Sequence, residues 1–187
     1  MSDVIVVDYG AGNTRSVRAA LTHLGRRSEV SADPALINAA SDVILPGVGS
    51  ARTAMAHLED TGAADALRRR FAADRPILGI CLGMQLALQA SEEDGGVKGL
   101  GLLEGLVVRL DAPRVPRLGW ALVEPWGGTF YFAHSFVAES ADTVATSEGL
   151  CAAVQHGSFL GVQFHPEKSD AAGLEFLASS MGTRASP

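Results

Sequence analysis

The sequence has few of the features that would place this chain outside the ordinary class of globular proteins. Only two of its 187 residues are cysteine, too few for a disulfide framework or a structural zinc site. Basic residues are also scarce, since 15 lysines and arginines against 21 acidic residues give a formal charge of -6. Because such a surface repels phosphate backbones and anionic lipid, we expect no nucleic-acid partner and no membrane partner.

Long apolar segments are also lacking. The uncharged stretch 76–91 is interrupted by glycine and glutamine and is shorter than the roughly 18 apolar residues that a membrane-spanning helix requires. The N-terminus enters an apolar run at Val4 without the basic start of a signal peptide. We therefore expect a cytoplasmic protein in which residues 1–187 form a single domain, with a frayed tail at 182–187.

The first half of the chain alternates short apolar runs with amphipathic stretches, and the two patterns predict strands and helices in turn. The predicted strands are 4–7, 43–45 and 76–80, and the predicted helices are 13–24, 63–72 and 84–90. Strands and helices that alternate at this spacing imply parallel strands with helices on both faces of the sheet.

The second half has short strand-like runs separated by turns, at 106–108, 129–132, 143–146 and 159–162. These predict antiparallel strands added to the parallel core, followed by a helix over 171–180. We therefore expect an α/β fold with a mostly parallel central sheet and an added antiparallel strand region.

Cys81 lies in the most informative local motif, Gly79-Ile80-Cys81-Leu82-Gly83, where a strand runs into a helix. A nucleophile elbow has this layout, with glycines two residues before and after the nucleophile because side chains there would clash with the strand and the helix. The helix N-terminus favours a thiolate and offers free N–H groups to an oxyanion. The alternative is a small buried cysteine at a strand end.

A nucleophilic thiol needs a base, and the base needs an orienting group. His165 ends a predicted strand, and Pro166 and Glu167 follow it. Two residues apart in an extended chain, His165 and Glu167 would point the same way, so Glu167 can accept a hydrogen bond from the imidazole. Alone, a surface His-Pro-Glu turn would be the better interpretation. Among the remaining histidines, His134 could line a site, whereas surface positions are expected for His23, His57 and His156.

Several motifs together carry a resemblance to a known family. Gly-Ile-Cys-Leu-Gly-Met-Gln at 79–85 and Gln-Phe-His-Pro-Glu at 163–167 resemble the class I (triad) glutamine amidotransferases. The further segments 8–17, 45–49, 131–136 and 167–169 are similar to those of the glutaminase subunits of imidazole glycerol phosphate synthase, which serve histidine biosynthesis. The resemblance covers nearly the whole chain and implies a three-layer α/β/α fold.

The resemblance also implies a role for each matching residue. Cys81 would attack the side-chain carboxamide of L-glutamine, His165 would move the protons, and Glu167 would hold the imidazole. The implied oxyanion hole is built on Gly47, Val48 and Leu82, and its glycine-rich strand end often has to reorient before it presents the donor. The implied glutamine-binding residues are Gly49, Gln85, Glu93, Ser135 and Phe136, and the implied partner interface includes Asn13, Ser16 and Trp120.

The partner implied by the resemblance is a (β/α)₈-barrel cyclase subunit, which forms a heterodimer with the glutaminase and receives its ammonia. No metal and no cofactor are implied. Arg117 and Ala121 replace polar residues that lie near the partner side in the family, and the segment 121–130 is short. These departures motivate a second hypothesis, a glutaminase that serves a different acceptor synthase. The residues also leave open a catalytically inactive regulatory subunit and an unrelated cysteine hydrolase.

Overall fold

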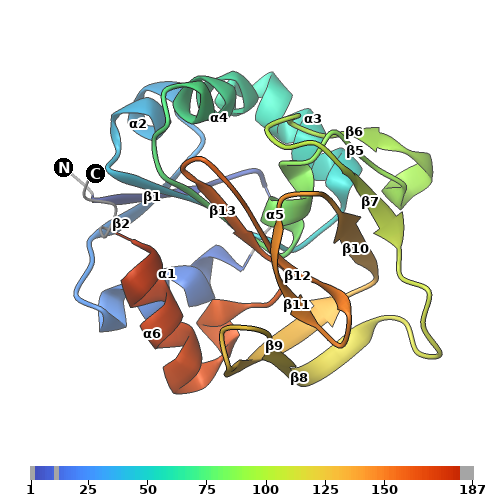
Figure 1. Ribbon diagram of the computed structural model, residues 1–187. Coiled ribbons are helices and arrows are strands. Elements are labelled where there is room, and N and C mark those ends of the chain that lie inside the picture. The colour runs from blue at the N-terminus through green and yellow to red at the C-terminus, as the bar shows by residue number, and fades with distance from the viewer. Residues whose placement is uncertain (1–2, 11–12, 182–187) are drawn as a thin grey trace.

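The computed structural model describes residues 3–10 and 13–181, and a seven-stranded sheet lies at its centre (Figure 1). The strand order is β11-β12-β13-β4-β3-β1-β2. Five neighbouring strands are parallel, namely β13 (Phe159–Val162), β4 (Ile77–Ile80), β3 (Asp42–Leu45), β1 (Val4–Val7) and β2 (Ser28–Ser31). Two antiparallel strands follow at one edge, β12 (Leu150–His156) and β11 (Thr143–Ser147). The predicted mostly parallel sheet with an antiparallel addition is confirmed.

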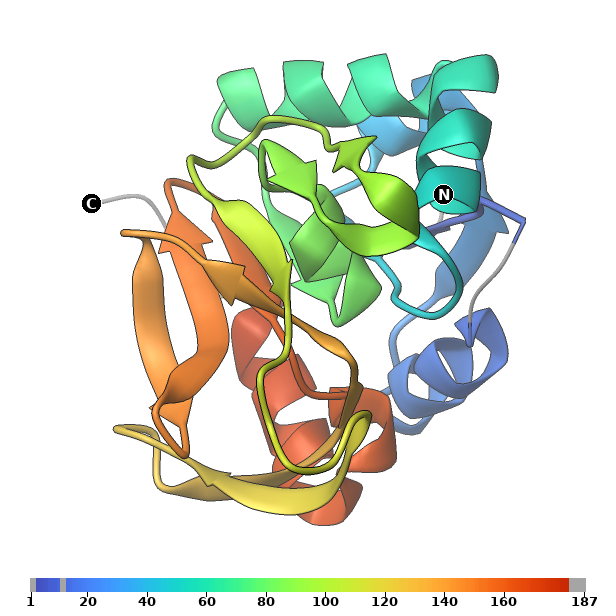
Figure 2. The same cartoon turned by 90° about the vertical axis from the view of Figure 1, so that its right-hand side faces the viewer.

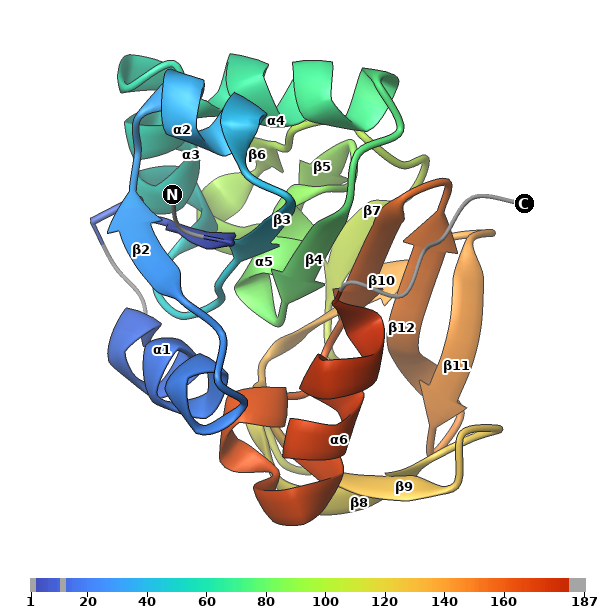
Figure 3. The ribbon, with the colours of Figure 1, turned by 90° about the vertical axis from the view of Figure 1, so that its left-hand side faces the viewer.

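Helices cover both faces of this sheet (Figure 3). One face carries α1 (Thr14–His23) and α6 (Asp170–Ser180), and the other carries α2 (Pro34–Ala39), α3 (Ala51–Asp60) and α4 (Ala63–Ala72). Side chains alternate along β1, where Ile5 and Val7 pack with the second group of helices and Val4 and Val6 with the first. Because both faces are buried, the central strands are continuous apolar runs, as expected for parallel sheets.

Two smaller sheets extend the core on the side of the molecule that Figure 2 shows. One has the order β10-β7-β5-β6, from β10 (Phe136–Glu139), β7 (Leu106–Arg109), β5 (Ala90–Ser91) and β6 (Val97–Lys98). The other is the hairpin of β8 (Arg117–Val123) and β9 (Gly128–His134). In the part of the chain that the structure describes, no helix has the length and apolar character needed to cross a membrane.

The helix predicted over 84–90 is shorter and begins earlier than expected. It is α5, Leu82–Leu86, and Ala90 already belongs to β5. The carbonyls that would continue the helix bond elsewhere, because the amides of Leu100 and Leu102 donate to Leu86 and Ala87. A loop therefore ends this helix, and the apolar residues that follow it are buried by that loop.

The run 159–162 was expected among the added antiparallel strands, and this placement is wrong in part. β13 pairs antiparallel with β12 but parallel with β4, at the centre of the sheet. Its sequence is apolar on both faces, which suits a buried central strand. β2 was missed because its residues are half-buried or exposed at the sheet edge and give no apolar run. The tail 182–187 lies outside the described residues.

Candidate active site

Cys81 stands at a sharp turn between β4 and α5, as the elbow motif predicts. Its backbone has φ 49° and ψ -107°, a region that costs a non-glycine residue about 1–3 kcal/mol. The flanking glycines permit the turn by close packing. A Cβ on Gly79 would lie 2.8 Å from the Met84 nitrogen, and one on Gly83 would lie 1.9 Å from the Leu45 carbonyl oxygen. The sequence therefore holds a buried thiol in a strained turn at a helix N-terminus.

His165 and Glu167 form a buried pair beside this turn. His165 Nδ1 lies 2.9 Å from Glu167 Oε1, and the two side chains are only 2% and 1% exposed. Burial alone would lower the pKa of His165, but hydrogen bonds to Cys81 and to Glu167 outweigh it and raise the pKa to about 9. The imidazole is therefore charged at neutral pH, next to the Cys81 side chain.

The local backbone around this pair differs from the expectation. β13 ends at Val162, and Pro166–Lys168 form a 3₁₀ turn, so His165 and Glu167 meet across a turn rather than along an extended strand. Proline at the first position of that turn explains the difference, because its fixed φ suits the helical region. Ser169 fixes the turn by accepting from the Tyr131 amide at 2.9 Å and donating to the His165 carbonyl at 2.6 Å.

Gln163 contacts the Cys81 sulfur directly, a role that was not predicted from the sequence. Its Nε2 donates to Cys81 Sγ at 3.5 Å, and its Oε1 accepts from Gln85 Nε2 at 3.0 Å. Gln85 Nε2 also donates to the carbonyl of Phe136 at 2.9 Å. Gln163 is completely buried, and a polar residue at an inward position just past a central strand was the available signal.

The proposed oxyanion donors lie next to one another at the elbow. A Cβ on Gly47 would stand 1.8 Å from the Ile80 carbonyl oxygen and 2.5 Å from the Leu82 nitrogen, so only glycine fits there. Leu82 opens α5, and the first amides of a helix have no intrahelical acceptor. The Val48 amide, in contrast, donates to the Tyr9 hydroxyl at 3.3 Å. The sequence left open whether Gly47 or Val48 supplies the second donor beside Leu82, and of these three amides the Val48 amide is the one with a described side-chain partner.

A cleft of about 320 Å³ opens in front of Cys81. The predicted site residues that line it are Gly47, Val48, Gly49, Cys81, Leu82, Gln85, Glu93, Ser135, Phe136 and His165. Glu93 is held in place by the Ala51 amide, which donates to its Oε2 at 3.2 Å, and burial raises the pKa of Glu93. The fold thus brings every predicted oxyanion and glutamine-binding residue to one cleft, with Glu167 behind His165.

His134 also lines the cleft, as the sequence suggested it could. Its Nδ1 lies 2.9 Å from the carbonyl of Phe136, and since a carbonyl only accepts, Nδ1 carries the proton. Burial lowers the pKa of His134 to about 4, so this imidazole is neutral at working pH. Its Nε2 is a buried acceptor without a hydrogen-bond partner among the described residues.

The predicted interface residues lie at the same end of the sheet. Asn13 caps α1, and its side chain accepts from the Ser16 amide at 3.4 Å. Trp120 is half exposed on β8, with its ring edge-on to Tyr131. The loop residues 11 and 12 that precede Asn13 lie outside the described residues.

Arg117 and Ala121, the departures from the family pattern, belong to the inward-facing residues of β8. Side chains alternate along this strand, and the inward set includes Ala121, which packs into the core. The guanidinium of Arg117 lies 4.3 Å from the centre of the Phe132 ring and donates to Ser147 and Glu148 at 2.9 Å each. Both of these side chains therefore make their described contacts within this chain.

The fold and this cleft define a class of protein, the triad amidotransferases that release ammonia from an amide. The sequence model of the glutamine amidotransferase class-I family matches residues 5–180, and the chain belongs to that family. It is 44% identical to the imidazole glycerol phosphate synthase subunit HisH of Symbiobacterium thermophilum, over 96% of this chain and 93% of the relative. It is 45% identical to the HisH subunit of Moorella thermoacetica, over 95% and 93% of the two chains.

Two further comparisons differ in length or in distance. The Arabidopsis thaliana protein named imidazole glycerol phosphate synthase hisHF, chloroplastic, is 42% identical over 94% of this chain, which spans 33% of that longer protein. A crystal structure of a glutamine amidotransferase superposes with a TM-score of 0.80 at 22% identity, covering 94% of this chain and 96% of the other. At that identity the superposition supports the fold alone.

Proposed function

We propose that this chain is the glutaminase subunit of imidazole glycerol phosphate synthase. It hydrolyses L-glutamine to glutamate and ammonia and passes the ammonia to a cyclase that makes imidazole glycerol phosphate in histidine biosynthesis. The observation that carries the proposal is the strained Cys81 beside the buried His165–Glu167 pair, in a chain with full-length similarity to HisH subunits. We further propose that residues 1–187 form one domain and that the protein acts in the cytoplasm.

The geometry supports a thioester mechanism. The Cys81 thiolate attacks the carboxamide carbon of glutamine, and the amides of Leu82 and Val48 bind the oxyanion that forms. His165 gives its proton to the departing nitrogen, so ammonia leaves and a γ-glutamyl thioester remains. His165 then takes a proton from water, which attacks the thioester and restores the Cys81 thiolate as glutamate forms. Glu167 keeps the imidazole in one tautomer throughout.

The exposed side of β8 supports docking of a partner. Leu118, Trp120 and Leu122 point outward in alternation and are 64%, 50% and 49% exposed. Leu118 also lines the mouth of the cleft, so a partner seated on this stripe would cover the point where ammonia leaves. We assign the stripe, with Asn13 and Ser16, to the interface with a (β/α)₈-barrel cyclase in a heterodimer.

The direct test is a reconstituted synthase. The chain is co-purified with the barrel cyclase of the same organism, and imidazole glycerol phosphate is measured with glutamine or with ammonium as the nitrogen source. Cys81→Ala should abolish the glutamine-dependent reaction and leave the ammonium-dependent one intact. Equal loss of both reactions would mean that Cys81 supports the structure and not the chemistry.

A second candidate is a glutaminase of the same type that feeds another acceptor synthase. The departures at Arg117 and Ala121 motivated it, but both side chains face inward, so they leave the proposed docking stripe unchanged. The segment 121–130, which is short relative to the family pattern and contains the turn between β8 and β9, is its remaining support. Glutamine hydrolysis without any cyclase-dependent product in the reconstitution would favour this candidate.

A further inference from the structure

The turn that carries Glu93 is fastened to the start of α3. This 3₁₀ turn, η1 (Glu93–Gly95), presents Glu93 to the cleft in front of Cys81. Ser50 caps α3, and the helix begins with the residue that follows it. The first amides of a helix have no acceptor within the helix, and here the carboxylates of η1 supply acceptors for two of them.

Two carboxylates of η1 bind neighbouring amides of α3. The Ala51 amide donates to Glu93 Oε2 at 3.2 Å, and the Arg52 amide donates to Asp94 Oδ2 at 3.3 Å. The positive end of the helix dipole favours negative charge at this position. A carboxylate has about four acceptor positions, so the bond to Ala51 leaves Glu93 with the capacity to bind an ammonium group in the cleft.

Asp94 is bound to the start of α3 through its side chain and through its backbone. The Ser50 hydroxyl donates to Asp94 Oδ2 at 2.6 Å, and this bond lowers the pKa of Asp94, so the carboxylate is ionised at neutral pH. The Arg52 guanidinium donates to the backbone carbonyls of Asp94 and Gly96. We call these contacts of Asp94 and Gly96 with Ser50 and Arg52 the α3 clamp.

The backbone around η1 needs contacts of this kind to hold its shape. Asp94 has φ 54°, and Gly95 and Gly96 follow with φ 80° and 102°, so three successive residues have positive φ. Glycine loses more conformational freedom on folding than any other residue, so a segment with two of them is costly to order. The α3 clamp supplies bonds that order this segment directly beside Glu93.

We propose that Asp94 is a positioning residue for glutamine binding, which holds Glu93 at the wall of the cleft where Glu93 meets the α-ammonium of the substrate. The inference rests on the glutaminase function proposed above and deepens it, since it names a residue behind the cleft wall that sets the affinity for glutamine. The α-ammonium is remote from the carboxamide carbon, so Glu93 binds it equally in the ground state and in the transition state. Binding of this uniform kind changes KM and leaves kcat unchanged.

Asp94→Gly tests the clamp in the reconstituted complex with the cyclase. Glycine adopts the positive φ of this position without strain, so the variant removes the side-chain bonds and keeps the turn. Because Glu93 then loses the support of its neighbour, the KM for glutamine should rise on the order of tenfold, with kcat within about twofold of wild type. Asp94→Asn keeps an oxygen acceptor for the Ser50 hydroxyl and the Arg52 amide, so its KM should be within about threefold of wild type.

Two controls separate a displaced Glu93 from a general loosening of the protein. Asp74 is an exposed aspartate with φ 51° in the turn after α4, at the opposite end of the sheet, so Asp74→Gly makes the same change to the backbone and should leave KM and kcat unaltered. Glutaramate, which is glutamine without the α-amino group, is tested as an inhibitor. Its inhibition constant should be the same in wild type and in Asp94→Gly, because it has no ammonium for Glu93 to bind.

An unchanged KM in Asp94→Gly would overturn the positioning role, and so would a KM in Asp94→Asn as high as in Asp94→Gly. A parallel rise in the inhibition constant of glutaramate would overturn it as well, since the whole cleft would then have loosened. None of these results touches the proposed glutaminase function, which fails instead if the wild-type complex never uses glutamine.

Discussion

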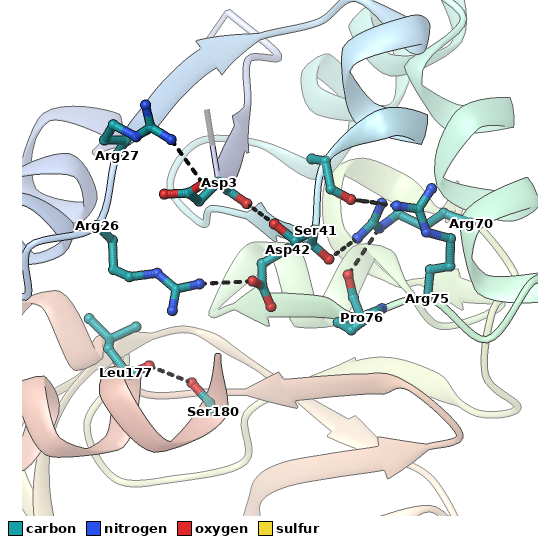
Figure 4. A network of polar contacts seen from close by, with 11 residues as sticks. Asp3, Arg26, Arg27, Ser41, Asp42, Arg70, Arg75, Pro76, Leu177 and Ser180 are labelled. Carbon is teal, nitrogen blue, oxygen red and sulfur yellow. Dashed lines mark hydrogen bonds and ion pairs between the residues drawn. The ribbon is translucent and has the colours of Figure 1, made fainter. Parts of the chain in front are cut away.

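The two ends of the central sheet differ in role, since one stabilises the fold and the other carries the candidate active site. At the amino ends of β3 and β4, Arg70 is buried and all its bonds go to backbone carbonyls (Figure 4). The acceptors, at 2.6–3.0 Å, are the carbonyls of Ile37, Ala40, Ser41 and Pro76. At the carboxyl ends of the same strands, Cys81 has a strained backbone, and His134 Nε2 and Glu167 Oε2 are buried without partners among the described residues. One end holds the fold together through Arg70, and the other presents a strained nucleophile and a buried imidazole to the cleft.

Substitutions of Cys81 should show the largest difference between the catalytic end and the amino end of the sheet. Cys81→Ala and Cys81→Gly should both lower glutamine turnover by at least about 10⁴-fold, because no nucleophile remains. They should differ in stability, since glycine tolerates the positive φ that alanine does not. We expect Cys81→Gly to unfold roughly 2–4 °C above Cys81→Ala, a gain of about 1 kcal/mol. Thermal unfolding with equal or reversed midpoints would show that the turn stores no strain.

Arg70→Met, at the amino end of the sheet, should lower the stability of the protein and leave its activity unchanged. It leaves buried carbonyls unpaired, and each costs about 1–3 kcal/mol, so we expect a loss of about 3 kcal/mol and a midpoint lower by roughly 10 °C. The specific activity of the folded fraction should be unchanged. Arg69→Met, at the exposed neighbouring position, is the matched control and should unfold within about 2 °C of wild type.

Glu167→Gln should change both the pH dependence and the maximal rate. Hydrogen bonds to Cys81 and Glu167 raise the pKa of His165 to about 9, so the proton donor for ammonia is lost as pH rises through about 9. Without the carboxylate, the alkaline limb of kcat/KM should move toward neutral pH, and kcat should fall by roughly 10²–10⁴-fold or less. A limb that stays near pH 9 in the variant would mean that Glu167 does not set the imidazole pKa.

The sequence predicts the two ends of the sheet unequally well. The elbow at Cys81 is readable because its glycines are set by close backbone contacts, and His165 and Glu167 are readable because proline marks the end of a strand. Gln163 was missed as a contact of Cys81, since the bond spans 82 positions and no local rule joins them. Arg70 gives no signal either, because an arginine in an amphipathic helix is expected at the surface, and only the tertiary fold places carbonyls around it.

Gln163→Met should have a smaller effect than the changes at the triad. Methionine fills a similar volume but cannot donate to Cys81 Sγ or accept from Gln85, both of which Gln163 does at 3.5 and 3.0 Å. A hydrogen bond to a charged group contributes about 1.5–3 kcal/mol, so kcat/KM should fall roughly tenfold or more. Gln163→Glu, which keeps an acceptor but adds charge beside the thiolate, should be slower still. If it were faster, the donor role would be wrong.

The smallest expected effect is an acid sensitivity confined to the catalytic end. Burial lowers the pKa of His134 to about 4, against an ordinary value near 6.5. Between these values the unfolded chain binds a proton that the folded chain refuses, so folding stability is full above pH 6.5 and falls as pH drops toward 4. The measurement compares unfolding midpoints at pH 7 and pH 5. In His134→Asn, part of the loss of stability at pH 5 should disappear. In the control His23→Asn, at an exposed position, the full loss should persist. Identical slopes in both variants would mean that His134 does not contribute to the acid sensitivity of the fold.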